Sequence, residues 1–460
     1  MKELDKDFIT QGKISSVIMT LSLPLMFNNL VRTLYNLTDG LFVARLSAED
    51  FAATSFVWPL NSIFISLGIG IGIGATSLIS QYLGAKNYKK AESYANNAII
   101  MIFLLGILSS IIGYLTAPTF LYWMGARDSF LLKATAYLQI SFFGLFFDFM
   151  FFGYQAILNA EGLTKDITRM SVISSLVNVI LDPIFIFDKI PFTQLTGLNL
   201  GITGAAWATI ASKFVLMLMA IATVNKRSNI KISYGKTKPD FSIMSTIGKI
   251  AFPTAIGYSG SSFGFTFMHG FIQSFGTNTM AAFAIGNRVT DLVTQPQMAI
   301  GTALTSIIGQ NVGAGNIERV KEVFKKALLI VFSFSLVASI VVLLFQSQLL
   351  TLFIKEGSDP EIWLQASEYI VFSAFIIFFM GFYSGFTGFF QGIGKTKYSM
   401  FMSIGRLWFV RLPMIWTFNN FTNLGPRGIW ISMLVSNFLT VFYAFIVYKK
   451  INLNSLSPRS

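Results

Sequence analysis

The stretch TLYNLTDG, residues 33–40, closes a long apolar run that begins near Ile14. It places a carboxylate, Asp39, inside a segment that the apolar pattern predicts to span a membrane. An acidic side chain in hydrocarbon is costly unless it is protonated, paired or facing a polar cavity, so its position indicates function. Steps of four, three and four residues lead along one helical face through Asn28, Arg32, Tyr35 and Asp39. We expect this polar face to have partners elsewhere in the chain.

The composition indicates an integral membrane protein with a helical bundle. Of the 460 residues, 53% are hydrophobic and only 12% are charged, whereas soluble domains usually carry about a quarter charged residues. Apolar segments long enough to cross a bilayer follow one another through almost the whole chain. Strand-like alternation is not visible, so we predict helices rather than a membrane β-barrel. The absence of cysteine excludes disulfides and thiolate metal sites.

Apolar blocks bounded by charged residues predict twelve spans. They cover approximately residues 14–39, 52–80, 93–117, 130–157, 167–188, 203–224, 244–273, 280–309, 324–345, 363–390, 397–418 and 428–448. Connectors on one side carry 23 Lys and Arg residues, against six on the other side. The positive-inside rule therefore predicts a cell-membrane protein with both termini and the central loop in the cytoplasm. The net charge of +13 reflects this topology, and we expect no nucleic-acid partner.

The longest polar connector, residues 225–240, divides the chain into two halves of six spans each. A shift of 229 residues superimposes Pro24 on Pro253, Thr76-Ser77 on Thr305-Ser306, and GAKN (84–87) on GAGN (313–316). Because each half has an even number of spans, the halves share one orientation, an arrangement that transporters use. We predict an N-terminal lobe at residues 1–224, a cytoplasmic linker at 225–242 and a C-terminal lobe at 243–460.

The intramembrane acids that best suit ion coupling lie in the first half only. Asp39 maps onto Met268, and Asp182 falls opposite a region without an acid. Asn178 and Asp182 are four residues apart on one helical face, and Pro183 frees a carbonyl one turn earlier. These oxygens suit a hard cation such as Na⁺, while a carboxylate shielded from water can equally bind a proton. A hydrogen bond between packed helices is the structural alternative.

Several motifs together resemble the multidrug and toxic compound extrusion (MATE) family. They are TLYNLTDG at residues 33–40, NVILDPIFI at 178–186, GAAWAT at 204–209, and the pair QYLGAKN (81–87) and QNVGAGN (310–316). The resemblance covers nearly the whole chain and points to the prokaryotic branch with an acid in the first span. It implies two six-helix lobes around a V-shaped cavity that opens alternately on each side. It also implies export of cationic and amphipathic organic compounds, driven by inward flow of H⁺ or Na⁺.

The resemblance further implies a coupling-cation site in the N-terminal lobe. Its residues are Asp39, Asn178, Asp182 and Thr209, which would also hold Na⁺ if that is the coupling ion. The candidates for the surrounding network or the substrate cavity are Tyr35, Arg32, Asn36, Gln155, Lys213 and Asp148. We expect no cofactor other than the transported ion, no enzyme activity, and a monomer in the bilayer.

Two charged residues depart from the family pattern. Lys213 follows Thr209 by one turn, and we hypothesise that it pairs with Asp182 or Asp39 until a cation displaces it. The alternative is a lysine whose amine reaches water. Asp148 is predicted either to pair with Arg32 or to act as a second proton site.

A different class of function keeps the same fold. A flippase for a lipid-linked precursor would need a basic cavity for pyrophosphate. The intramembrane basic residues available for it are Arg32, Lys213, Arg288, Arg406 and Arg411. For Arg288 the simpler interpretation is an ion pair with Asp291, three residues further along the same helix.

Overall fold

The computed structural model describes residues 7–191, 195–235, 237–354 and 359–456, and these residues are almost entirely helical. Each of the twelve predicted spans is present as a helix or as a run of consecutive helices. Nine of the helices in the described ranges are long and apolar enough to cross a membrane. The predicted all-helical membrane fold is therefore confirmed.

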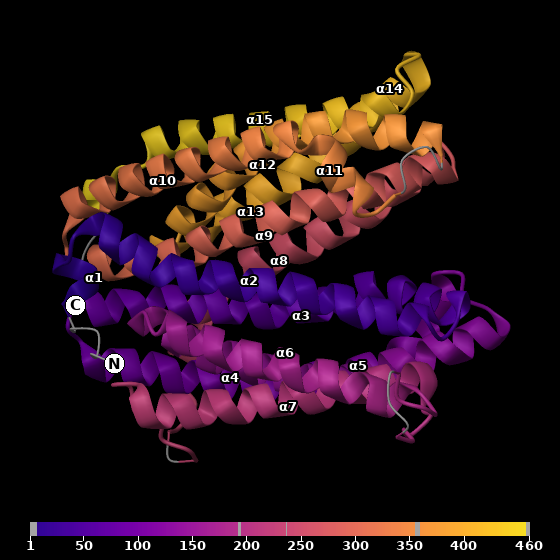
Figure 1. Ribbon diagram of the computed structural model, residues 1–460. Helices are drawn as coiled ribbons and strands as arrows, with labels where there is room; N and C mark the ends of the chain where they lie inside the picture. Colours follow the sequence, from indigo (N-terminus) through magenta and orange to yellow (C-terminus); the bar gives the residue numbers. More distant parts are fainter. Residues whose placement is uncertain (1–6, 192–194, 236, 355–358, 457–460) are drawn as a thin grey trace. The chain divides into compact units, whose positions relative to one another are not determined.

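The chain forms two compact units. We call Phe27–Ala255 the N-terminal unit, and Met1–Met26 together with Ile256–Ser460 the C-terminal unit. The N-terminal unit holds most of α2 (Ile14–Ala44), then α3 (Ala48–Gly84), α4 (Tyr88–Trp123), α5 (Asp128–Glu161), α6 (Thr164–Ile186), α7 (Gly201–Arg227) and the first part of α8 (Phe241–Gln273). Within it, α5 packs against α3, α4 and α7, and α7 packs against α6 (Figure 1).

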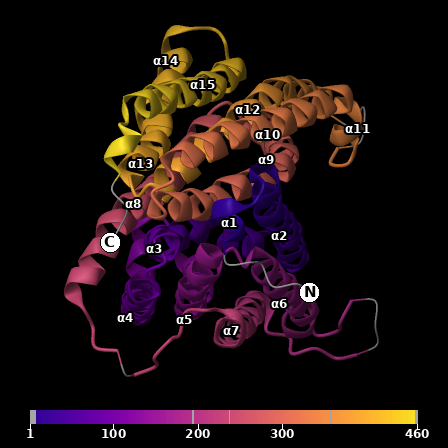
Figure 2. The ribbon, with the colours of Figure 1, turned by 90° about the vertical axis from the view of Figure 1, so that its left-hand side faces the viewer.

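The C-terminal unit is built around α12. It contains α1 (Phe8–Gln11), the start of α2, the rest of α8, α9 (Thr277–Gly313), α10 (Ile317–Leu344), α11 (Gln346–Thr351), α12 (Pro360–Gly392), α13 (Thr396–Ile404), η1 (Gly405–Arg411), α14 (Leu412–Phe421), α15 (Pro426–Lys450) and η2 (Leu453–Ser455). Helix α12 packs against α9, α10 and α15 (Figure 2). The predicted eleventh span is not one regular helix, because a π-helical segment, η1, separates α13 from α14.

The internal repeat is visible in the helices themselves. Helices α3 and α9 begin and end at the same 229-residue offset. After each helix an asparagine caps the next one: Asn87 accepts from the backbone N–H of Lys90 at 3.1 Å, and Asn316 from that of Arg319 at 3.3 Å. The sequence repeat thus corresponds to repeated local structure.

Helices α2 and α8 each belong to both units. The unit boundaries follow Met26 and Ala255, two residues after the repeat-related Pro24 and Pro253. Proline cannot complete the hydrogen-bond ladder of a helix, so each helix has a weak point close to where it changes unit.

Specific contacts hold the exchanged segments in place. In the C-terminal unit, the carbonyl of Ile9 accepts from Asn311 at 3.4 Å, and that of Gly12 accepts from Arg319. In the N-terminal unit, the start of α8 lies so close to α3 that a Cβ at Gly74 would be 3.1 Å from the carbonyl oxygen of Ile247.

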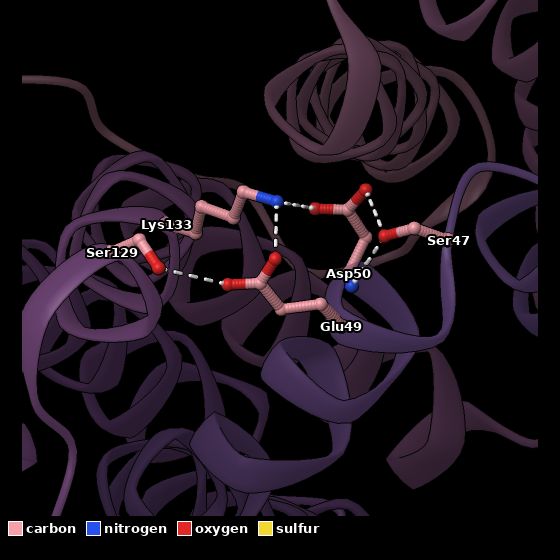
Figure 3. Close-up of polar contacts among 5 residues, drawn as sticks. All are labelled: Ser47, Glu49, Asp50, Ser129 and Lys133. Atoms are coloured by element: carbon pink, nitrogen blue, oxygen red, sulfur yellow. Dashed lines mark hydrogen bonds and ion pairs between the residues drawn. The ribbon is translucent and has the colours of Figure 1, made fainter.

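Two further sets of contacts order the N-terminal unit. The ends of α3 and α5 are joined by Lys133, whose amine lies 2.8 Å from Glu49 Oε2 and 3.4 Å from Asp50 Oδ1 (Figure 3). The linker after α7 is fixed to α4 because Asn96 Oδ1 accepts from the backbone of Ser233 and Asn97 Oδ1 from that of Asp240, both at 2.8 Å.

Candidate functional site

The polar face of α2 presents Tyr35 and Asp39 to the interior of the N-terminal unit. Both side chains are partly buried. Oδ1 of Asp39 is shielded from solvent and has no hydrogen-bond partner among the described residues. The carboxyl groups of Asp39 and Asp182 are close enough to hydrogen-bond when one of them is protonated. The structure therefore brings together the two acids that the sequence placed on different spans.

Helix α6 supplies Asn178 and Asp182, and both are completely buried, with 0% of their surface exposed. With its amide oriented to satisfy both neighbours, Asn178 donates to Asp182 Oδ2 at 2.8 Å and accepts from the backbone N–H of Thr209 at 3.1 Å. Pro183 follows in the last turn of α6, so the carbonyl of Val179 lacks its usual helical donor. The amide of Asn178 thus links Asp182 on α6 to α7.

Helix α7 reaches this position because it packs directly on the backbone of α6. A Cβ at Gly204 would overlap the carbonyl oxygen of Phe185, so only glycine permits this approach. One further contact fixes the pair, since Ser174 Oγ donates to the carbonyl of Ser212 at 2.8 Å. Thr209 is consequently placed beside Asn178, and its side chain lies within hydrogen-bonding reach of Tyr35.

Lys213 pairs with Asp148, and neither residue has the partner that we expected. Its Nζ lies 2.6 Å from Asp148 Oδ2, with 23% of the Lys213 side chain and 16% of the Asp148 side chain exposed. The predicted pairs with Asp39 or Asp182, and of Asp148 with Arg32, are therefore wrong. The cause is the close contact of α5 and α7, where a Cβ at Gly144 would lie 2.7 Å from Ile210. Lys213 still exerts an electrostatic influence on Asp39.

Comparison with known proteins identifies the family. The sequence pattern of the family described as MatE matches residues 24–184 and 253–417 of this chain. The chain belongs to the MATE family. It is 26% identical to the probable multidrug resistance protein YoeA of Bacillus subtilis, covering 98% of each chain. It is 24% identical to a protein of Shewanella oneidensis named FAD transporter, covering 97% of each.

A solved structure gives the same assignment for the fold. It is described as the outward-facing conformation of a multidrug resistance MATE family transporter of the MOP superfamily. The alignment has 26% sequence identity and a TM-score of 0.90, and it covers 99% of both chains. The protein is therefore a multi-pass membrane transporter of the MATE family rather than an enzyme.

Three other predicted residues lie outside the cluster of this MATE transporter. Arg32 and Asn36 are exposed on α2, and Gln155 is partly buried on α5. Among the described residues, no hydrogen bond connects any of the three to Asp39 or Asp182.

In the C-terminal unit of the MATE transporter, the predicted Arg288–Asp291 pair is also absent from the described contacts. Oδ2 of Asp291 instead accepts from Asn287 at 3.1 Å, one helical turn earlier. The amide of Asn287 therefore supplies a hydrogen bond to this carboxylate from within the same helix.

Sequence reasoning missed Tyr137 on α5. It packs against a small apolar cluster that contains Val43 and Ile186, and it lies within electrostatic range of Asp39 and Asp182. A signal was available, because Tyr137 precedes Asp148 by eleven residues, which is three helical turns on the same face.

Proposed function

We propose that this MATE transporter exports cationic and amphipathic organic compounds in exchange for H⁺ or Na⁺ by alternating access. The observation that carries the proposal is the pair of carboxyl groups formed by Asp182, which is completely buried on α6, and Asp39, which is partly buried on α2. The drug-resistance names of relatives support the substrate class, and the intramembrane acids support cation coupling.

The carboxyl pair can respond to a cation by holding or releasing α2. When the pair carries one proton, Asp39 and Asp182 can share a hydrogen bond and α2 stays attached to α6. When both are ionised, two adjacent negative charges in a poorly hydrated site repel each other strongly. Because α2 continues past Pro24 into the other unit, this local change acts on a helix that both units share.

Sodium could neutralise the same pair. The two carboxylates, the hydroxyl of Thr209 and the carbonyl of Val179, which Pro183 leaves without its usual helical donor, are oxygen ligands of the kind that hard cations prefer. In either case coupling requires only that two states of the transporter differ in their affinity for the cation and for the exported compound.

Proteoliposomes test the proposal directly. Efflux of an ethidium-like dye is measured under a pH gradient alone and under a Na⁺ gradient alone, with FAD as a second cargo because one relative bears that name. The wild type should respond to one of the gradients. Asp39→Asn should reduce gradient-driven efflux at least about fivefold, because a typical coupling free energy between two binding sites changes affinity by that factor or more.

The control is Asp188→Asn, which removes an exposed acid from the same unit but outside the cluster. It should transport like the wild type. Retained gradient-driven efflux in a folded Asp39→Asn protein would defeat the proposal.

We also propose a monomer in the cell membrane with both termini in the cytoplasm. The support is the distribution of 23 basic residues on one side of the predicted spans and six on the other. Some of the six are neutralised, since Lys133 pairs with Glu49 and Arg427 pairs with Glu368.

A flippase for a lipid-linked pyrophosphate remains the second candidate function. Two of its five basic residues are poorly suited to bind pyrophosphate, because Lys213 is paired with Asp148 and Arg32 is exposed on α2. Arg406 and Arg411 are the specific observation in its favour, because they are neighbours on one segment of the C-terminal unit. Lipid transfer without dye efflux in proteoliposomes would favour this candidate.

A further inference from the structure

The C-terminal unit buries two arginines. Only 6% of Arg406 and 2% of Arg411 is exposed. Burying a guanidinium is costly unless an opposite charge or a full set of hydrogen bonds compensates it. Among the described residues, neither arginine lies within ion-pair distance of a carboxylate.

The neighbours of both arginines are neutral, and they accept hydrogen bonds from only some of the guanidinium N–H groups. Nε of Arg411 donates to Ser436 Oγ at 2.9 Å. Nη1 of Arg406 donates to Asn437 Oδ1 at 3.2 Å, and its guanidinium lies 4.6 Å from the centre of the Tyr383 ring. Nε of Arg406 is buried and has no hydrogen-bond partner in the described part of the chain. The guanidinium of Arg406 therefore has a buried N–H donor that no described residue accepts.

The π-helix explains why the two charges are close together. In a regular α-helix, residues five apart point about 140° away from each other. In a π-helix the repeating hydrogen bond joins residues i and i+5, so Arg406 and Arg411, at the two ends of that step, share a face. Arg406 accordingly exerts a repulsive influence on Arg411. The irregular segment thus concentrates positive charge, which a plain helix would have separated.

We propose that Arg406 and Arg411 form an anion-binding site for a phosphate group that carries about two negative charges. Two guanidinium groups offer paired donors and a charge of two, which matches the several oxygens and the charge of a phosphomonoester or pyrophosphate. Ser436 and Asn437 supply further polar contacts at its edge. The phosphate belongs either to a lipid headgroup or to a soluble compound. The site lies wholly within the C-terminal unit and does not depend on the coupling role of Asp39.

Binding to the purified full-length protein tests the site in two arms. In the first, thermal unfolding is followed with increasing pyrophosphate. In the second, the protein is placed in nanodiscs of phosphatidylcholine with or without phosphatidic acid. Stabilisation by phosphatidic acid alone identifies a lipid ligand, and stabilisation by pyrophosphate alone identifies a soluble one. No stabilisation of the wild type in either arm overturns the proposal.

Variants separate specific binding from general charge. Arg406→Gln and Arg411→Gln should each weaken binding by about tenfold or more, the usual effect of losing a hydrogen bond to a charged group. Arg427→Gln removes one positive charge at an exposed ion pair of the same unit and should bind like the wild type. If a glutamine variant does not fold, Arg406→Lys and Arg411→Lys keep the charge but lose the paired donors, and they should also bind more weakly. Equal affinity in all of the variants would show that the arginines serve packing only.

Discussion

At the scale of single residues, the N-terminal unit contains two separate pairs of charged side chains. Asp39 and Asp182 form a pair of like groups, whereas Lys213 and Asp148 form an ordinary ion pair nearby. Because its amine is engaged by Asp148, Lys213 influences Asp39 without bonding to it. A coupling cation consequently meets two carboxyl groups that are not already neutralised by a protein side chain.

The Lys213–Asp148 ion pair is open to a double-mutant cycle. Lys213→Met leaves a partly buried carboxylate unpaired and should lower the free energy of unfolding by about 1–3 kcal/mol. Asp148→Asn should have a similar effect, and the double variant should cost less than the sum of the two. Thermal unfolding in detergent measures all four proteins. Additive effects would show that the pair contributes nothing to stability.

At the scale of helices, small residues decide which side chains meet. Gly204 lets α7 touch the backbone of α6, and Gly144 brings α7 against α5. Both contacts occur within two turns of the residues that they position, Thr209 and Asp148. The geometry of the candidate site therefore depends on residues that carry no functional group themselves.

Gly204→Ala tests this dependence. The added methyl group would overlap the carbonyl of Phe185, so the variant should be destabilised by about 1–3 kcal/mol and should lose efflux. The matched control is Gly270→Ala, where a Cβ meets nothing within 4 Å. That helical substitution should leave stability unchanged or raise it slightly. Equal behaviour of the two variants in thermal unfolding and dye efflux would contradict the packing argument.

At the scale of the whole molecule, the predicted orientation in the membrane can be measured because the natural chain contains no cysteine. Lys189→Cys, on the side poor in basic residues, should react with a membrane-impermeant maleimide in intact cells. Lys89→Cys, on the basic side, should react only after permeabilisation, because the positive-inside rule places it in the cytoplasm. The reverse labelling pattern would refute the proposed topology.

The sequence predicted the helices, the repeat and the i, i+4 pair of Asn178 and Asp182, because periodicity along one chain determines which residues share a face. It did not predict the partner of Lys213, which depends on how closely α5 approaches α7. It also did not predict η1, because a π-helix has no simple signature in the order of residues. A contact between helices accounts for the first of these misses, and an irregular backbone within one span accounts for the second.

The exchange of helix ends between the units sets an order for biosynthesis. Ile9 contacts Asn311, which is synthesised 302 residues later. At the usual rate of translation this interval is about 15–60 s. During that time α1 and the first part of α2 lack the helices of the C-terminal unit against which they finally pack. The later part of α2 can already pack with α3 to α7. The N-terminal unit, in turn, is complete only when the start of α8 arrives, so neither half of the gene product reaches its final packing alone.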